Sequence, residues 1–209
     1  FNPKGRKSTI TLSDRTRVEL NAQSKIEYID NFSPNKREVT LTGEAFFDVQ
    51  RDENRPFIIN VNGVTVKVLG TSFNIKGYPG DNFIQVAVAS GHVEVYDISN
   101  NNYVDLRIDE VADYSYASGN FHKGQITDKD LIFGWKEQKL VFRDQDLYSI
   151  AEVLSRWYGV EVQLEGIDKL NKKVTGVYEN ASLREVLIGL RHNYKFEFEL
   201  NGKTVRIYK

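Results

Sequence analysis

The sequence contains no cysteine and no methionine. The absence of cysteine excludes disulfide bonds, thiol catalysis and cysteine-ligated zinc together. The absence of methionine, in a chain that begins at Phe1, indicates a fragment of a longer protein. We therefore expect any targeting or membrane segment to lie upstream of Phe1.

Long hydrophobic runs and an excess of one charge are also missing. The apolar stretches are far shorter than the roughly 20 residues that span a bilayer, and no signal-peptide pattern opens the chain. The formal net charge is −1 and the pI is about 6.4, so the positive charge that a nucleic-acid binder needs is absent. With 209 residues, 40% of them hydrophobic, the chain can fold as one large domain or two modest ones.

Motifs for catalysis or cofactor binding are missing as well. There is no nucleophile elbow, no Walker loop and no dinucleotide fingerprint, and no activated serine context supports a serine nucleophile. Histidines with the i, i+4 spacing of a helical zinc site are also absent, and we interpret the three present as scattered surface residues: His92, His122 and His192. We therefore expect no catalytic residue, no cofactor and a protein that is not an enzyme.

One acidic cluster is the remaining candidate for a metal site. It lacks the tight alternation and the glycine of an EF-hand loop, and it consists of Asp105, Asp109, Glu110 and Asp113. We interpret it as a solvated charged turn. The sequence predicts no metal site.

The first part of the chain has the period of β-strands. From Ser8 to about Gly124 apolar and polar residues alternate, which is typical of half-buried strands. Asn62-Gly63 between two such runs is a strong signal for a two-residue hairpin. We predict an all-β domain over residues 1–130, built as a sandwich, a roll or a solenoid-like stack, and the sequence leaves these three open.

The second part of the chain repeats itself. The stretch 142–164 aligns with 178–200 at a constant offset of 36 residues, and each copy has the pattern strand, helix, strand. Asp146 and Ser182 occupy equivalent helix N-cap positions, Ser182 with Glu185 fits a capping box, and Gly159 suits a helix stop. A turn at Asn201-Gly202 then leads into a last strand. We predict a second domain of α+β class over residues 131–209, in which two βαβ units bury their helices against a small sheet.

Three side chains do not fit a simple core position and are candidates for a partner surface. Phe46 lies on the opposite face of its strand from Ala45 and Phe47, and Trp157 stands at the margin of a helix stripe with Arg156 as its charged neighbour. Such side chains either cover a seam between domains or contact a partner. The edges of a small sheet can also recognise a partner by strand addition, and the candidate edges are KLVF (139–142), KKVTGVY (172–178) and TVRIY (204–208).

Several of these segments, taken in order, resemble a known family. KSTITLSDRTRVELNAQSKIEY, REVTLTGEAFFDV, RPFIINVNGVTVKVLGTSFNIKGY and VAVASGHVEVYD are similar to the periplasmic region of FecR-type anti-sigma regulators. WKEQKLVFRDQDLYSIAEVLSRWYGVEV and VTGVYENASLREVL are similar to the domain that follows it in Bacteroidetes members. That domain in turn resembles the short N-terminal domain of secretins and TonB-dependent transporters.

The resemblance implies the periplasmic region of a single-pass inner-membrane protein. Its partners would be the signalling domain of an outer-membrane TonB-dependent transporter and, through an N-terminal cytoplasmic segment, an extracytoplasmic-function sigma factor. The family has no active site to transfer, so the LGTSFN stretch (69–74) is expected to be an architectural corner with Phe73 buried. The alternative function is a carbohydrate-binding β module whose exposed aromatic rings stack on sugars, and the βαβ repeat counts against it.

Overall fold

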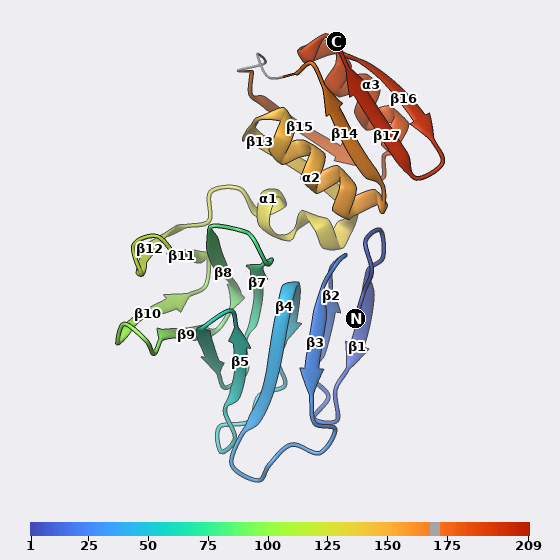
Figure 1. Cartoon of the computed structure of the whole chain (residues 1–209). Helices are drawn as coiled ribbons and strands as arrows, with labels where there is room; N and C mark the ends of the chain where they lie inside the picture. Colours follow the sequence, from blue (N-terminus) through green and yellow to red (C-terminus); the bar gives the residue numbers. More distant parts are fainter. Residues whose placement is uncertain (168–171) are drawn as a thin grey trace. The chain divides into compact units, whose positions relative to one another are not determined.

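The computed structural model describes residues 1–167 and 172–209. The chain divides into two compact units, which are shown in Figure 1. Phe1–Asn2 and Lys7–Asp128 form the first unit, and Pro3–Arg6 and Lys129–Lys209 form the second. The sequence predicts two domains, residues 1–130 and 131–209; in the two units the long segments meet between Asp128 and Lys129, and Pro3–Arg6 belongs to the second unit.

The first unit consists of strands, as its period-two pattern predicts. They are β1 (Ser8–Thr11), β2 (Arg17–Leu20), β3 (Lys25–Tyr28), β4 (Arg37–Asp48), β5 (Phe57–Val61), β6 (Val64–Val68), β7 (Ser72–Gly77), β8 (Phe83–Ser90), β9 (His92–Asp97), β10 (Asn102–Arg107), β11 (Glu110–Ser115) and β12 (Asn120–Gln125). The Asn62-Gly63 hairpin is confirmed: both residues have positive φ, 44° and 88°, and Val61 pairs with Val64.

The strands of the first unit form two layers that share β4. Residues 37–42 of β4 pair with β3 and β5 in the layer β3-β4-β5-β6-β9-β10. Residues 43–48 pair with β2 and β7 in the layer β1-β2-β4-β7-β8-β11-β12. Gly43 begins the second half with φ 97°, and a Cβ there would lie 2.4 Å from the Ser24 hydroxyl, so the position requires glycine.

The core of the first unit lies between these layers. Alternate side chains of the central strands point inward and are fully buried, among them Val18, Phe47, Phe57, Val66 and Ile75. Burying such side chains contributes roughly 1.5–3 kcal/mol each. The predicted β-rich class is therefore confirmed, and the strands form one 12-stranded sheet that folds into two layers at β4.

The two layers also approach each other at the opposite end of the sheet. The Lys123 ammonium donates a hydrogen bond to Asp105 O on β10 at 2.8 Å, and the Asn102 side chain donates to Gly119 O at 3.2 Å. Side chains thus bridge β10 and β12 where no backbone ladder joins them, and the sheet closes partway toward a barrel.

The second unit contains the predicted repeat. Its elements are α1 (Lys129–Phe133), the 3-10 turn η1 (Gly134–Glu137), β13 (Lys139–Gln145), α2 (Leu147–Tyr158), β14 (Glu161–Glu165), β15 (Val174–Glu179), α3 (Leu183–Tyr194), β16 (Glu197–Asn201) and β17 (Thr204–Tyr208). The helices α2 and α3 have equal length, and α3 begins and ends 36 residues after α2 does. None of the described helices has the length and apolar character needed to cross a membrane.

The helix ends follow the local chemistry of the sequence. Asp146 caps α2 by accepting from the Ser149 N–H, and Ser182 and Glu185 form the predicted capping box on α3. Gly159 ends α2 in the left-handed conformation at φ 70°. The predicted caps and the predicted helix stop are confirmed.

The expectation of one small sheet in the second unit is wrong. β13 pairs only with β15, antiparallel, and a separate sheet has the order β14-β17-β16. The described part of the unit therefore has two small sheets. The apolar faces of α2 and α3 share one core with both of them, and Leu154 and Leu190 are fully buried in it.

Candidate interaction surfaces

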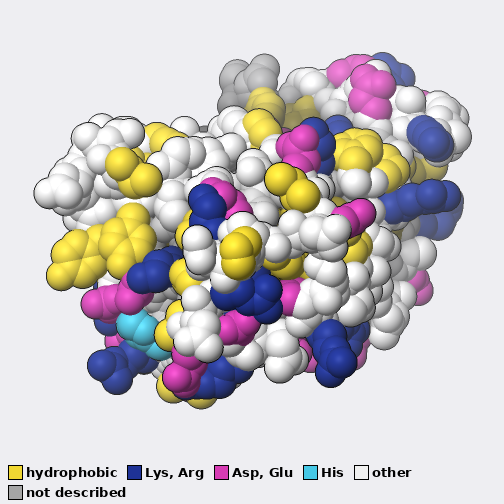
Figure 2. All heavy atoms as spheres, turned by 90° about the horizontal axis from the view of Figure 1, so that it is seen from below, with side chains coloured by type: hydrophobic (Ala, Val, Ile, Leu, Met, Phe, Trp, Pro, Cys, Tyr) yellow, Lys and Arg dark blue, Asp and Glu magenta, His cyan; other side chains and the backbone are white. Residues whose placement is uncertain are grey.

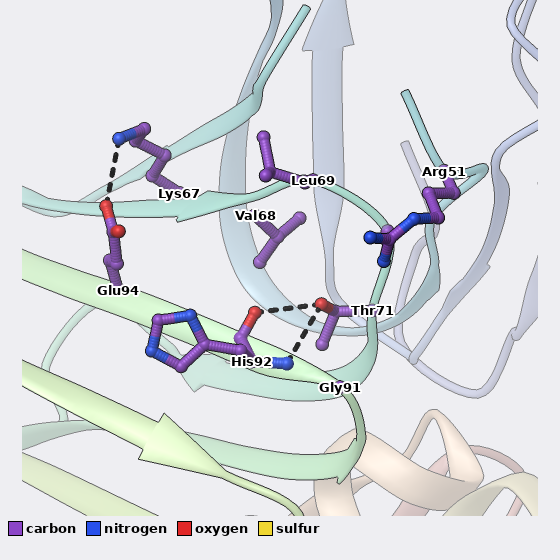
Figure 3. Close-up of a pocket in the computed structure, with 9 residues that line it drawn as sticks. Arg51, Lys67, Val68, Leu69, Thr71, Gly91, His92 and Glu94 are labelled. Atoms are coloured by element: carbon purple, nitrogen blue, oxygen red, sulfur yellow. Dashed lines mark hydrogen bonds and ion pairs between the residues drawn. The ribbon is translucent and has the colours of Figure 1, made fainter. Parts of the chain in front are cut away.

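The Leu69-Gly70-Thr71 stretch forms a corner at which two chain segments change layer side by side. Residues 69–71 lead from β6 to β7, and Gly91 leads from β8 back to β9. The Thr71 hydroxyl donates to His92 O at 2.8 Å and accepts from the His92 N–H at 3.3 Å, as Figure 3 shows. Gly91 has φ 81°, and a Cβ there would lie 2.8 Å from Thr71 Oγ1.

The corner is therefore architecture, as the sequence predicts. The Thr71 side chain replaces the backbone pairing that the two segments lose where they leave the sheet. Phe73, two residues further on, is fully buried and stacks on Phe47 with ring centroids 5.4 Å apart. The interpretation of the stretch as a structural element is confirmed.

A pocket of about 280 Å³ lies at this corner. Arg51 stands on one side of it, and Lys67 and Glu94 stand on the other (Figure 3). Lys67 Nζ lies 2.9 Å from Glu94 Oε2. The Tyr96 hydroxyl donates a hydrogen bond to Glu94, which lowers the pKa of Glu94, and a smaller contribution from Lys67 lowers it further. The Tyr96–Glu94 hydrogen bond also raises the pKa of Tyr96 to about 12.

The charges around this corner pocket are balanced within the molecule. Arg51 pairs with Glu53 at 2.6 Å, and His92 Nε2 lies 3.3 Å from Asp105. All four side chains are at least half exposed, so each pair contributes little to stability. Basic and acidic side chains are also interspersed on the face of the molecule in Figure 2.

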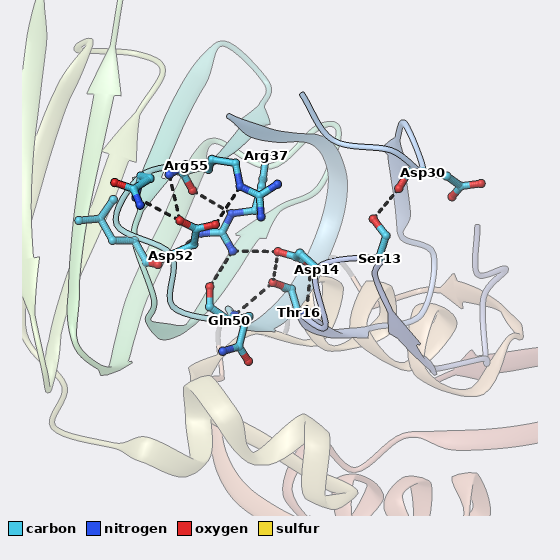
Figure 4. Close-up of polar contacts among 10 residues, drawn as sticks. Ser13, Asp14, Thr16, Asp30, Arg37, Gln50, Asp52 and Arg55 are labelled. Atoms are coloured by element: carbon cyan, nitrogen blue, oxygen red, sulfur yellow. Dashed lines mark hydrogen bonds and ion pairs between the residues drawn. The ribbon is translucent and has the colours of Figure 1, made fainter. Parts of the chain in front are cut away.

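Arg37 is a buried charged residue whose contacts give it a structural role. Its side chain is fully buried, and Figure 4 shows it among its partners. It donates from Nη1 to Asp14 Oδ2 at 2.8 Å and to Gln50 O at 2.6 Å, from Nε to Arg55 O at 2.9 Å and from Nη2 to Leu69 O at 3.3 Å. The guanidinium thus holds the loop after β4 against the corner.

The acidic candidates from the sequence are held in separate contacts. Glu110 accepts from the Arg107 N–H and pairs with Lys123, and Asp113 accepts from Gln85. Within residues 1–167 and 172–209 no three acidic or histidine side chains gather closely enough to hold a metal ion. His92 begins β9, His122 lies in β12 and His192 lies in the last turn of α3.

The three predicted partner-binding residues lie in different surroundings. Phe46 belongs to β4 of the first unit and is only 8% exposed. Arg156 and Trp157 lie at the end of α2 and are partly buried, and Trp157 contacts the hydrophobic core of the second unit. Their role in binding stays a prediction.

One of the predicted strand edges is wrong. β17, the TVRIY strand, lies between β14 and β16 and pairs with both, so neither of its edges is open. β13 and β15 pair only with each other among the described residues, and each keeps one open edge. On their outer face Val141 pairs with Val177, which is 48% exposed.

Sequence reasoning missed a second apolar position on the surface of this unit. Ile188 lies on the outer face of α3 and is 53% exposed. It lines a shallow groove with Arg191, His192, Lys195, Phe196 and Glu197. The signal was present in the sequence, because Ile188 is the one large aliphatic residue of this helix outside its buried stripe, and basic residues surround it.

Two family models match the chain. The one described as FecR protein matches residues 3–94, and the one described as FecR, C-terminal matches residues 139–207. Two crystal structures, at 1.65 and 2.50 Å resolution, each of a proposed anti-sigma factor from Parabacteroides distasonis ATCC 8503, are similar to it. Each of these two proteins is 30% identical in sequence to this chain, and the match covers 100% of this chain. It covers 97% of the first protein and 96% of the second, with TM-scores of 0.87 and 0.88. No similar sequence was found among curated proteins.

Proposed function

Since the chain belongs to the FecR family of anti-sigma regulators, we propose that it is the periplasmic sensor region of a membrane-anchored regulator. In this role it receives a signal from the signalling domain of an outer-membrane TonB-dependent transporter. It passes the signal on, through a segment on the other side of the inner membrane, to an extracytoplasmic-function sigma factor. The signal travels by protein–protein contact.

The observation that carries this proposal is the open two-stranded sheet of the second unit. β13 and β15 each have one edge that pairs with no other described strand. Such an edge can accept a strand from another small α+β domain, and the added backbone hydrogen bonds supply affinity. The half-exposed Val177 on β15 would lie beside the added strand and give it an apolar contact.

The charged side chains are consistent with a contact function. At the corner pocket Lys67 is engaged by Glu94 and His92 by Asp105, and the buried Arg37 is engaged by Asp14 and three backbone carbonyls. Groups that act in catalysis are usually held with a perturbed pKa inside a cleft. Here the strongest polar interactions stabilise the fold.

The proposal is tested by titrating the whole chain with the signalling domain of a TonB-dependent transporter from the same organism, using isothermal titration calorimetry. We expect Val177→Glu to weaken binding at least tenfold, because a carboxylate would then stand beside the added strand. The matched control is Ile108→Glu, which changes a residue of similar exposure, 57%, in a turn of the first unit.

Two results would contradict the proposal. Equal affinities of the Val177 and Ile108 variants would remove the edge of β15 from the contact. Absence of binding by the unaltered chain, together with micromolar binding of glycans that survives deletion of residues 136–209, would favour the carbohydrate-binding alternative.

A further inference from the structure

The internal repeat allows the two helix ends of the second unit to be compared directly. α2 ends at Gly159 with φ 70°, and α3 ends 36 residues later at Lys195 with φ 56°. In both helices the backbone N–H of this left-handed residue donates to the carbonyl four residues earlier, Ser155 O and Arg191 O. The backbone conformation at the two helix ends is therefore equivalent. The ends differ in their side chains and in whether another segment of the chain lies over them.

The end of α2 is covered by an extended segment of the chain itself. The Gly5 N–H donates to Arg156 O at 2.8 Å, and the Lys4 ammonium donates to Ser155 Oγ at 2.9 Å. The approach is so close that a Cβ on Gly159 would lie 3.0 Å from Lys4 O. A helix end leaves its last carbonyls without an intrahelical partner, and this segment, Pro3–Arg6, supplies one donor.

The end of α3 is a groove of about 510 Å³ instead. His192 is the residue equivalent to Arg156, and no described residue outside the helix donates a backbone N–H to His192 O. The main chain at this groove is therefore arranged as it is at the end of α2, where Pro3–Arg6 binds. Among the described residues no segment crosses the groove.

The side chains of this α3 groove specify what would fill it. Ile188 replaces Glu152 of the first copy, and it adds a half-exposed apolar surface next to the buried Phe196. Lys195 replaces Gly159, so a segment cannot approach this cap as closely and would lie toward Ile188.

Both helix ends carry basic residues, with Arg156 in the last turn of α2 and Arg191 in the last turn of α3. The segment that covers α2 carries its own cations, Lys4 and Arg6. In the α3 groove Arg191 is paired with Glu197, with Nη2 and Oε1 2.7 Å apart, so Lys195 supplies the net positive charge of the groove lining. Electrostatic complementarity therefore favours an acidic occupant.

We propose that the α3 groove binds an extended, acidic segment of a partner protein. One apolar side chain of the segment contacts Ile188, a carboxylate of the segment lies near Lys195, and a backbone N–H reaches His192 O. This contact goes beyond the proposed function, which places the transporter on the edge of β15, and it does not depend on that function.

The experiment selects binders from a phage-displayed library of random 12-residue peptides, with the whole chain as the target. We expect enriched peptides that combine Asp or Glu with a large apolar residue. Their affinity, measured by fluorescence polarisation with the synthetic peptides, should fall at least tenfold for Ile188→Glu and for Lys195→Glu. Tyr148→Glu is the matched control, because Tyr148 is a helix residue of similar exposure, 52%, on α2.

Melting temperatures of all variants establish that they are folded, and amide shifts of the labelled chain locate the peptide. Enriched peptides without acidic residues, or peptides that bind the three variants alike, would overturn the proposal. A chain that self-associates in sedimentation, and becomes monomeric with Ile188→Glu, would assign the groove to a second copy and overturn it too. A Val177→Glu variant that still binds the peptides separates this groove from the transporter contact.

Discussion

The Thr71 hydroxyl and the main chain of His92 exchange two hydrogen bonds, one to His92 O at 2.8 Å and one from its N–H at 3.3 Å. Thr71 is 4% exposed, so water cannot readily replace these bonds. The side chain thereby joins the two segments that change layer at this corner.

We expect Thr71→Val to lower the free energy of unfolding by about 1–3 kcal/mol, because the change keeps the shape but removes the partner of two part-buried backbone groups of His92. Urea denaturation measures it. Thr65→Val is the matched control, since the Thr65 hydroxyl bonds only the Asn60 side chain on the outer face. A cost for Thr71→Val no greater than that of the control would show that the corner does not need this hydroxyl.

Arg37→Met should be more damaging, at about 3–5 kcal/mol, because it leaves the Asp14 carboxylate buried without its cation. It also removes the donor to three backbone carbonyls. Arg37→Lys should recover only part of the loss, since an ammonium cannot reproduce the planar fork. Full stability of Arg37→Lys in the same denaturation experiment would contradict this assignment.

Leu154→Ala and Leu190→Ala should each cost about 2–5 kcal/mol, because both side chains are fully buried at equivalent places in the repeat. Ile188→Ala, a truncation of similar size on the exposed face of α3, should cost less than about 0.5 kcal/mol. Costs below about 1 kcal/mol for both leucines would show that the two helices do not share the core described here.

We expect the free energy of unfolding to rise with pH between the pKa of Lys7 in the folded chain and its pKa in the unfolded chain. Burial lowers the pKa of Lys7 to about 8, and the nearby Glu44 carboxylate opposes this shift. Between that value and the ordinary lysine pKa of about 10.4 the unfolded chain holds a proton that the folded chain has released. The free energy of unfolding therefore increases with pH across this window.

The measurement is a series of urea midpoints from pH 8 to pH 9.5. The upper limit avoids the tyrosines, because burial raises the pKa of Tyr158 and Tyr194 to about 12 and gives the opposite slope above pH 10. Lys7→Met should flatten the rise. Equal slopes for the two proteins would show that Lys7 does not titrate in this window.

The parts of the fold that local chemistry controls could be predicted from the sequence. The hairpin at Asn62-Gly63, the caps at Asp146 and Ser182 and the stop at Gly159 each depend on neighbours within a few residues. The partners of β17 could not be predicted in this way. Its alternation shows that Val205 and Ile207 are buried, but the pairing of its two edges depends on strands far away in the chain.

The candidate sites also divide into features that depend on nearby residues and features that depend on distant parts of the chain. The side chains of Trp157 and Arg156 could be placed near a helix end from their spacing, whereas the complete burial of Arg37 depends on loops after β4 and on the corner at Leu69. The α3 groove depends on comparing two helix ends, and only the structure shows that a segment covers one of them.

Trp157 offers the last test, because it contacts the core of the second unit and stays partly exposed. We expect Trp157→Ala to lower the melting temperature, since truncating a large side chain removes apolar contacts. If Trp157 is also an anchor for the transporter's signalling domain, affinity per folded molecule should fall at least tenfold at 15 °C, where the variant is still folded. Trp157→Phe keeps most of the packing and should recover stability more fully than binding, because a smaller ring fills an interface pocket poorly. Unchanged affinity of folded Trp157→Ala would give Trp157 a purely structural role and leave the open edge of β15 as the contact to be tested.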